Sequence, residues 1–141
     1  MTVERTTKDV DDFLGGLQGK RGDDMRLLDG AIQERMPDAG RHLYEGTFWG
    51  GSDQQIVGYG VMDYTNRSGE EVEWFVIGIA EQKNYLSMYV NAVAEGEYLL
   101  REYSDKLGKA KVGSASISFD SVDDLQIGPL FEMIDRAAES V

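Results

Sequence analysis

The stretch VEWFVIGIAEQKNYLSMYV, residues 72–90, decides the fold of this chain. Apolar side chains recur at every second position on both sides of a short polar segment, EQKN at 81–84, a pattern typical of two half-buried β-strands. So short a connection joins neighbouring antiparallel strands. The stretch therefore predicts strands over 72–81 and 85–91 inside a largely antiparallel sheet.

The same period of two appears on both sides of this hairpin. It predicts three further strands, over 41–48, 55–64 and 114–119, and a turn at 66–69. The sheet is therefore expected to have about five strands.

Four helices are expected around the sheet. A short N-terminal helix follows a capping pattern of Thr6 with Asp9, and a second helix runs over 23–36 before Pro37. A third covers 95–107 and ends at Gly108, and a C-terminal helix follows the capping pattern of Ser121 with Asp124. Residues 1–141 therefore read as a single α+β domain, with the N-terminal and C-terminal helices packed on one face of the sheet.

The alternation sorts the strand residues into two faces that differ in character. The face expected in the core carries Val57, Tyr59, Val61, Phe75, Ile77, Ile79, Leu86, Met88, Val90, Ala115, Ile117 and Phe119. The opposite face is small, aromatic and hydroxyl-rich, and it carries Gly58, Gly60, Trp74, Val76, Gly78, Tyr85, Ser87, Tyr89, Ser114, Ser116 and Ser118.

Three interpretations of this second face remain open. Glycines within strands often mark the close approach of a ring, a backbone or a ligand, so the face would floor a shallow pocket. Antiparallel sheets also commonly leave one polar face in water. Tryptophan and tyrosine are enriched in interface cores, so the face would alternatively meet a second copy of the chain or another protein.

Composition excludes several classes of protein. The chain of 141 residues has no cysteine and a formal net charge of −12, which argues against disulfides, thiolate chemistry and the binding of nucleic acids or acidic membranes. The N-terminus lacks the apolar run of a signal peptide, and no stretch is long enough to span a bilayer. We expect a cytoplasmic protein.

One short segment reverses the sign of the charge. Between Lys106 and Phe119 there is no acidic residue, and Lys109 and Lys111 lie between Gly108 and Gly113. Glycines would leave backbone amides free to face an anion, and lysine supplies a mobile positive charge. The segment therefore indicates a site for a carboxylate or phosphate, although lysines after a helix C-terminus also simply favour its dipole.

A metal site or a catalytic site is harder to derive. His42 is the only histidine, so zinc ligands of the ordinary kind are missing. The acids that would hold a hard cation lie near expected helix N-termini, where the helix dipole alone explains them: Asp9, Asp12, Asp120, Asp123 and Asp124. No nucleophile with an orienting base and no cofactor fingerprint is present, so the sequence leans away from an enzyme.

An ordered set of short motifs resembles the YdhG-like family of domains of unknown function. The motifs are Trp49 with Gly50, IVGYG at 56–60, SGEEVEW at 68–74, FVIGIAEQKNYLSMYV at 75–90, LGKAKVG at 107–113 and SVDDL at 121–125. The resemblance implies a small cytosolic α+β domain, and some relatives are described as frataxin-like iron chaperones. It thereby implies iron as a ligand to consider.

The family pattern carries over to this chain in part. Matching positions are Trp49, Gly58, Gly60, Trp74, Gly78, Lys83, Leu86, Tyr89, Gly108, Lys109, Lys111 and Gly113. The chain departs from the pattern at Glu81 and Gln82, where relatives commonly have Pro and Arg, and at Ala110, Val112, Ser114 and Ser116. Polar contacts that depend on those family side chains are not expected here.

The sequence thus predicts a non-enzymatic binding protein, either delivering iron or holding a small anion. Its expected ligand-binding residues are Trp49, Gly58, Gly60, Trp74, Lys83, Tyr85, Tyr89, Lys109 and Lys111. The alternative is a protein-interaction module or homodimer that uses the glycine, tryptophan and tyrosine face.

Overall fold

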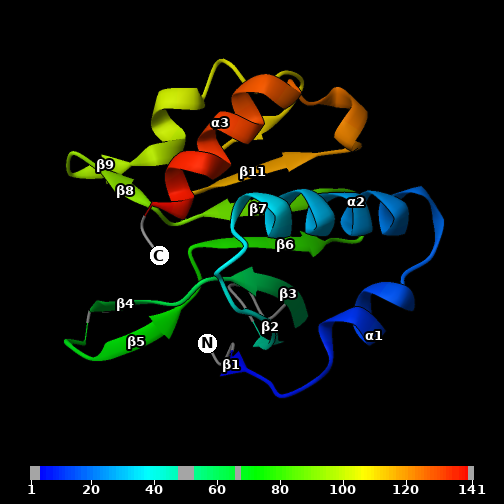
Figure 1. Cartoon of the computed structure of the whole chain (residues 1–141), viewed down its shortest axis with the longest axis horizontal. Coiled ribbons are helices and arrows are strands. Elements are labelled where there is room, and N and C mark those ends of the chain that lie inside the picture. Colours follow the sequence, from blue (N-terminus) through cyan, green and yellow to red (C-terminus); the bar gives the residue numbers. More distant parts are fainter. Residues whose placement is uncertain (1–3, 48–52, 66–67, 140–141) are drawn as a thin grey trace.

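The chain folds into a large antiparallel sheet with helices packed against it, which confirms the α+β class (Figure 1). The computed structural model describes residues 4–47, 53–65 and 68–139. In these ranges the sheet has seven strands rather than about five, in the order β1-β2-β3-β6-β7-β11-β10. The strands are β1 (Glu4–Arg5), β2 (Arg41–Thr47), β3 (Asp53–Tyr59), β6 (Ile77–Glu81), β7 (Leu86–Val90), β11 (Ser116–Phe119) and β10 (Lys111–Val112).

The two strands that the sequence did not predict form the edges of the sheet. β1 and β10 are two residues long, which is too short for an alternating pattern to show. β1 pairs with β2, and β10 pairs with β11. Short edge strands of this kind limit unwanted pairing with other chains.

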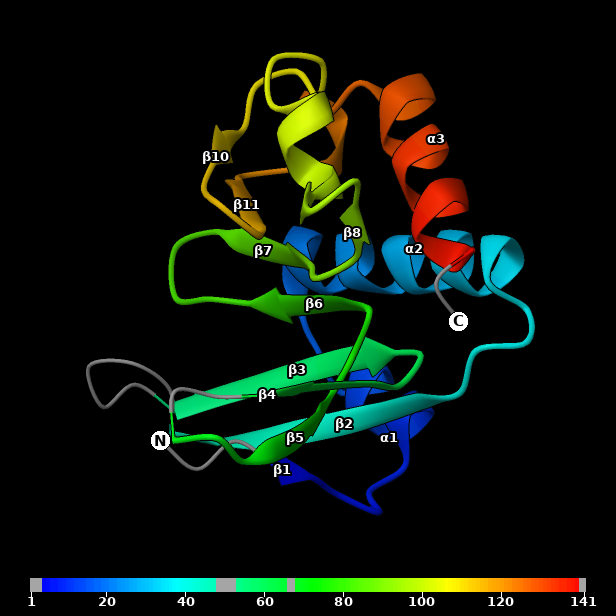
Figure 2. The same ribbon diagram turned by 90° about the vertical axis from the view of Figure 1, so that its left-hand side faces the viewer.

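Two expected long strands are each interrupted. The strand expected over 55–64 ends at Tyr59, because Gly60 turns the chain with a φ of 76°. The following segments, β4 (Met62–Thr65) and β5 (Glu71–Trp74), pair only with each other among the described strands. Figure 2 shows this hairpin in front of β2 and β3, with α1 behind them. Residues 66–69, where a turn was expected, lie between β4 and β5 in the sequence, but residues 66 and 67 lie outside the described ranges.

Three α-helices bury the expected core face of the sheet. They are α1 (Val10–Gly15), α2 (Gly19–Arg35) and α3 (Ile127–Ala138). Asp9 caps α1 by accepting a hydrogen bond of 3.2 Å from the backbone N–H of Asp12. Thr6, expected as the cap, instead donates its hydroxyl to the carbonyl of Leu43 at 2.8 Å. One core cluster joins the helices to the strands, and it includes Leu14, Met25, Leu28, Ile32, Leu130, Ile134, Val57, Ile77, Ile79, Met88 and Ile117.

Helix boundaries differ from the prediction in physically clear ways. α2 begins at Gly19, four residues before the expected start. The side chain of Ser121 caps a single 3₁₀ turn, η3 (Val122–Asp124), instead of the C-terminal helix. α3 begins afterwards at Ile127, with Pro129 in its first turn as expected.

The helix predicted over 95–107 is wrong. The segment contains the hairpin of β8 (Val93–Ala94) with β9 (Glu97–Tyr98), followed by the short 3₁₀ helix η2 (Leu99–Tyr103). Glu95 and Gly96 have φ angles of 53° and 83°. Two consecutive residues with positive φ make the tight turn that antiparallel hairpins favour, so a helix cannot start here.

Phe75 lies on the opposite face from the one predicted. The strand expected over 72–81 is interrupted at Phe75 and Val76, so the alternation changes phase between β5 and β6. Val76 consequently joins the helix-covered core, and Phe75 packs on the second face. Val61 was also expected in the core, but it follows the turn at Gly60 and is 43% exposed.

No helix within the described ranges is long and apolar enough to cross a membrane.

Candidate functional site

The second face of the sheet is divided into two parts, and the first is a cluster of packed rings. We call Tyr44, Ile56, Trp74, Phe75 and Ala80 the aromatic cluster. The ring of Trp74 stacks on that of Phe75 at a centroid distance of 4.4 Å, and the ring of Tyr44 meets Phe75 edge-on at 5.1 Å. The cluster forms a second small core on the face opposite the helices.

Gly58 and Gly78 lie under this cluster. A β-carbon at Gly58 would lie 2.6 Å from Cε1 of Tyr44 and 2.7 Å from Cβ of Phe75. A β-carbon at Gly78 would lie 2.4 Å from Cε1 of Phe75. The glycines in these strands are therefore explained by the chain's own rings, because any side chain would occupy the same space.

The second part of this face is open and polar. We call Tyr85, Ser87, Tyr89, Ser116 and Ser118 the serine face. Strand pairing brings these residues together, because Ser116 is opposite Tyr89 and Ser118 is opposite Ser87. On the other side of β11, the edge residue Lys111 is opposite Ser118.

Two hollows cover the serine face. One has a volume of 480 Å³, extends over the β6–β7 connection and includes Lys83. The other has a volume of 910 Å³ and lies against the segment 108–113, with Lys109 and Lys111 in its wall. They share Tyr85, Ser116 and Ser118 and so form a continuous surface. Volumes of this size are typical of small-molecule sites.

Tyr89 of the serine face packs against the aromatic cluster and joins a small hydrogen-bond network there. The side-chain amide of Gln82 donates to Gln54 Oε1 at 2.9 Å and to the Tyr89 hydroxyl at 3.4 Å. Burial raises the pKa of Tyr89, and hydrogen bonds with Ser87 and Gln82 oppose that rise. The phenol is therefore neutral near pH 7 and serves as a polar wall of the hollow.

The lysines at the margin of the serine face form no ion pair in the described part of the chain. The side chains of Lys83, Lys109 and Lys111 are exposed and form no ion pair or hydrogen bond with a described residue. By contrast, Lys8 and Lys20 each pair with a carboxylate, at 2.7 Å and 2.6 Å. These three ammonium groups are thus available to a ligand.

The backbone amides near Lys109 were expected to be free to face an anion, but two of them are hydrogen-bonded within the chain. The N–H of Lys109 donates to the carbonyl of Asp124 at 2.9 Å, and the N–H of Gly113 donates to that of Ser116 at 2.8 Å. Gly108 allows this arrangement through its φ of 91°, with the carbonyl oxygen of Asp124 only 2.5 Å from where a β-carbon would lie. These two amides already have partners, so an anion here would meet ammonium and hydroxyl groups.

The structure therefore separates the expected ligand-binding residues into two groups. Gly58 and Trp74 lie at the aromatic cluster. Gly60 follows β3, and its N–H donates to the carbonyl of Gly40. The serine face and its margin bring together Lys83, Tyr85, Tyr89, Lys109 and Lys111. Trp49 lies outside the described residues.

The acids considered for metal binding do not form a common site in the described ranges. Asp9 caps α1, Asp123 lies 3.4 Å from Lys20, and Asp120 lies 4.0 Å from Arg21. No group of three histidine, cysteine, aspartate or glutamate side chains suited to a metal ion occurs among the described residues. Iron delivery stays a prediction from the family resemblance.

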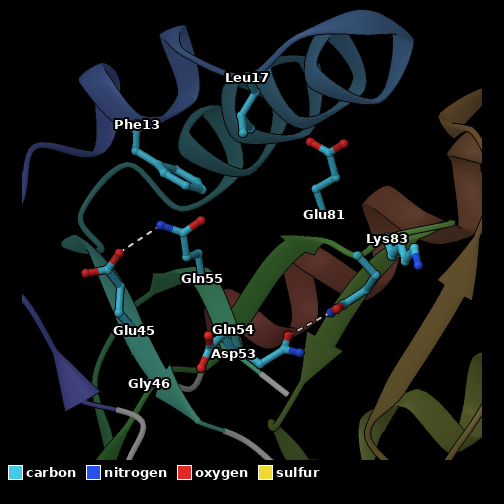
Figure 3. Close-up of a pocket in the computed structure, with 10 residues that line it drawn as sticks. Phe13, Leu17, Glu45, Gly46, Asp53, Gln54, Gln55, Glu81 and Lys83 are labelled. Carbon is cyan, nitrogen blue, oxygen red and sulfur yellow. Dashed lines mark hydrogen bonds between the residues drawn. The ribbon is translucent and has the colours of Figure 1, made fainter. Parts of the chain in front are cut away.

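A further cleft, of 720 Å³, adjoins the serine face at the ends of the strands (Figure 3). Phe13 and Leu17 cover it from the helix side, and the walls include Glu45 of β2 and Glu81 of β6. Sequence reasoning missed these residues as a site. They come from segments far apart in the chain. The pairing of β2 with β3 and of β3 with β6 brings the strands of Glu45 and Glu81 together, and the packing of α1 against α2 and β2 adds Phe13 and Leu17.

The comparisons with known proteins add no relative: no protein-family model matches the chain, and neither does any curated protein or solved structure.

Proposed function

We propose that this protein binds a small anionic molecule, a carboxylate or a phosphate, on the serine face. The observation that carries the proposal is the placement of Lys83, Lys109 and Lys111, none of them in an ion pair with a described residue, around a continuous polar hollow. A lysine ammonium is a mobile donor that suits oxygen anions of varied shape.

The floor of the hollow supports the same proposal. Serine hydroxyls both donate and accept hydrogen bonds, so Ser116 and Ser118 would adjust to an oxyanion or to a ligand hydroxyl. Tyr85 is 41% exposed and offers its ring to a flat or apolar part of the ligand. Acids also line the hollows, at Asp120 and Asp124 in the larger and at Asp53 in the smaller, and they weaken the attraction of the lysines for an anion.

The affinity is expected to be modest. Exposed ion pairs contribute about 0.2–1 kcal/mol each, and the net charge of −12 opposes the approach of an anion. We therefore expect a Kd on the order of 1 mM for a simple anion such as citrate. A physiological ligand that also contacts Tyr85 and the serines would bind more tightly.

The test is an NMR titration of the ¹⁵N-labelled protein with citrate, and separately with phosphate, at constant ionic strength. We expect amide shifts in 85–89, 108–113 and 116–118, and at least fivefold weaker binding by the Lys109→Gln/Lys111→Gln variant. Lys106→Gln is the matched control, because Lys106 lies against the ring of Tyr103, outside the hollows.

Two results would contradict the proposal. One is the absence of shifts in these segments at saturating citrate. The other is equal binding by the wild type and the double variant, with both folded by circular dichroism. A shift pattern confined to the cleft of Figure 3 would also place the anion elsewhere.

A further inference from the structure

The cleft beneath α1 presents a carboxylate that has no partner in the described chain. The side chain of Glu81 is partly buried, and it forms no hydrogen bond or ion pair with a described residue. Figure 3 shows its carboxylate directed toward the helices, on the side of the cleft below Leu17. The attraction between a carboxylate and a cation is stronger at a partly buried position than in open water, because the effective dielectric constant is lower there.

The other walls of the cleft differ from Glu81 in this respect. Glu45 accepts hydrogen bonds from Lys8 at 2.7 Å and from Gln55 at 2.8 Å, and these bonds lower its pKa. The amides of Gln54 and Gln82 bond each other at 2.9 Å. Asp53, the third carboxylate of the walls, also has an interaction partner. Among the carboxylates that line the cleft, Glu81 is therefore the one without a partner in the described chain.

Apolar surface lies next to this carboxylate. The ring of Phe13 and the side chain of Leu17 are partly buried and cover the cleft from the helix side (Figure 3). A ligand hydrocarbon would pack on these two side chains, and an ammonium close to the ring would gain a cation–π contribution. Lys83 also lines the cleft, but Figure 3 shows it extending away from Phe13 and Leu17.

The chemistry of the walls favours an organic cation over a metal ion. Glu45 and Glu81 stand on different walls, and the described residues contain no convergent group of three ligands for a metal. A metal ion would also gain nothing from Phe13 and Leu17. The net charge of −12 attracts cations to the surface as a whole.

We propose that this cleft binds a primary amine with an apolar body, its ammonium paired with Glu81 and its hydrocarbon held between Phe13 and Leu17. This site adjoins the anion site of the serine face, but its argument does not depend on that site. The two sites share Asp53, Gln54, Gln82 and Lys83, which line both the cleft and the smaller hollow.

The test compares three ligands of similar shape and different charge by NMR titration: 2-phenylethylamine, 2-phenylethanol and 3-phenylpropanoate. We expect the amine to shift amides in 13–17, 45–46 and 79–83 and to bind at least fivefold more tightly than the neutral alcohol. The acid should not bind in the cleft. Added salt should weaken binding of the amine, because the Glu81 pair is partly exposed.

Variants separate the contribution of the ammonium pair with Glu81 from that of the hydrocarbon contact with Phe13. Glu81→Gln should weaken amine binding at least fivefold and leave the alcohol unaffected, whereas Phe13→Ala should weaken both. Glu97→Gln, in the β8–β9 hairpin away from the cleft, is the control for a change in net charge. Lys109→Gln/Lys111→Gln should leave amine binding unchanged, which separates this proposal from that of the anion site.

Equal affinity for the amine and the alcohol in the wild type would overturn the proposal, and this comparison needs no variant to fold. So would full amine binding by a folded Glu81→Gln protein, or shifts that map only to the serine face.

Discussion

The ring of Phe75 lies so close to Gly78 that a β-carbon there would be 2.4 Å from Cε1 of the ring. We therefore expect Gly78→Ala to destabilise the protein, because overpacking a core costs about 1–3 kcal/mol and sometimes more. Urea unfolding followed by circular dichroism measures the loss.

Gly30→Ala is the control. Gly30 lies inside α2 with open space around it, so this change should stabilise the protein by about 0.5–1 kcal/mol. Equal stabilities for Gly78→Ala and the wild type would show that the aromatic cluster can shift.

The hydroxyl of Tyr59 donates to Oδ1 of the buried Asp29 at 2.6 Å, beside the ion pair of Asp29 with Arg41. Burial, followed by the charge of Asp29, raises the pKa of Tyr59 well above its usual value. The protonated phenol therefore stabilises the fold below about pH 10, and this contribution is lost as the pH rises above that value.

Tyr59→Phe should accordingly cost about 1–2 kcal/mol at neutral pH. The stability difference from the wild type should narrow as the pH rises above about 10, because the variant has no phenol to ionise. Urea unfolding across this range measures it, with Tyr98→Phe as the control for an exposed hydroxyl. A difference that stays constant with pH would contradict the assignment.

Asp24 joins α2 to the turn that precedes α3. Its carboxylate is buried and accepts hydrogen bonds from Lys20 Nζ at 2.6 Å and from the backbone N–H of Val122 at 3.1 Å. Asp24→Ala leaves that buried N–H without a partner, so we expect a loss of about 1–3 kcal/mol in unfolding free energy. Lys20→Ala should cost less, because this ammonium is largely exposed. The opposite order would mean that the ion pair, and not the backbone bond, holds the two segments together.

Glu95 has a φ of 53° at the first position of the β8–β9 turn, before Gly96. Asparagine adopts this conformation more readily than glutamate, and Asn-Gly is the preferred sequence for such a turn. Glu95→Asn should raise the unfolding free energy by about 0.5–1 kcal/mol. Glu97→Asn, on the adjoining strand, has no comparable reason to stabilise and serves as the control. A destabilised Glu95→Asn protein would argue against a turn at this position.

Local patterns were sufficient for the elements with a clear period. The alternation at 77–81 and 86–90 identified the central hairpin and its core face. The capping pattern of Thr6 with Asp9 indicated a helix start near α1, but the N-cap is Asp9 and not Thr6. The same reasoning failed at Phe75, where an interrupted strand changes the phase, and at 95–107, where a hairpin turn replaces the expected helix. Period rules assume that an element continues, so they err where the chain bends inside one.

The candidate sites were predictable only in part for a related reason. Lys109 and Lys111 stood out by their charge, and the structure places both beside Tyr85 in one hollow. The cleft that joins Phe13 to Glu81 has no signal in the sequence, because its walls come from separate elements.

The sequence by itself determined the α+β class, and it determined the two faces of a strand wherever the alternation continued without a bend, because side-chain alternation is a property of the extended backbone. The tertiary structure alone decided which part of the second face is filled. β3 pairs with β6, although the β4–β5 hairpin lies between them in the sequence. The interruption between β5 and β6 places Phe75 over Gly58 and Gly78. β7 pairs with β11 across residues 91–115 and leaves the serine face open. These pairings join residues distant in the chain, and local propensity does not encode them.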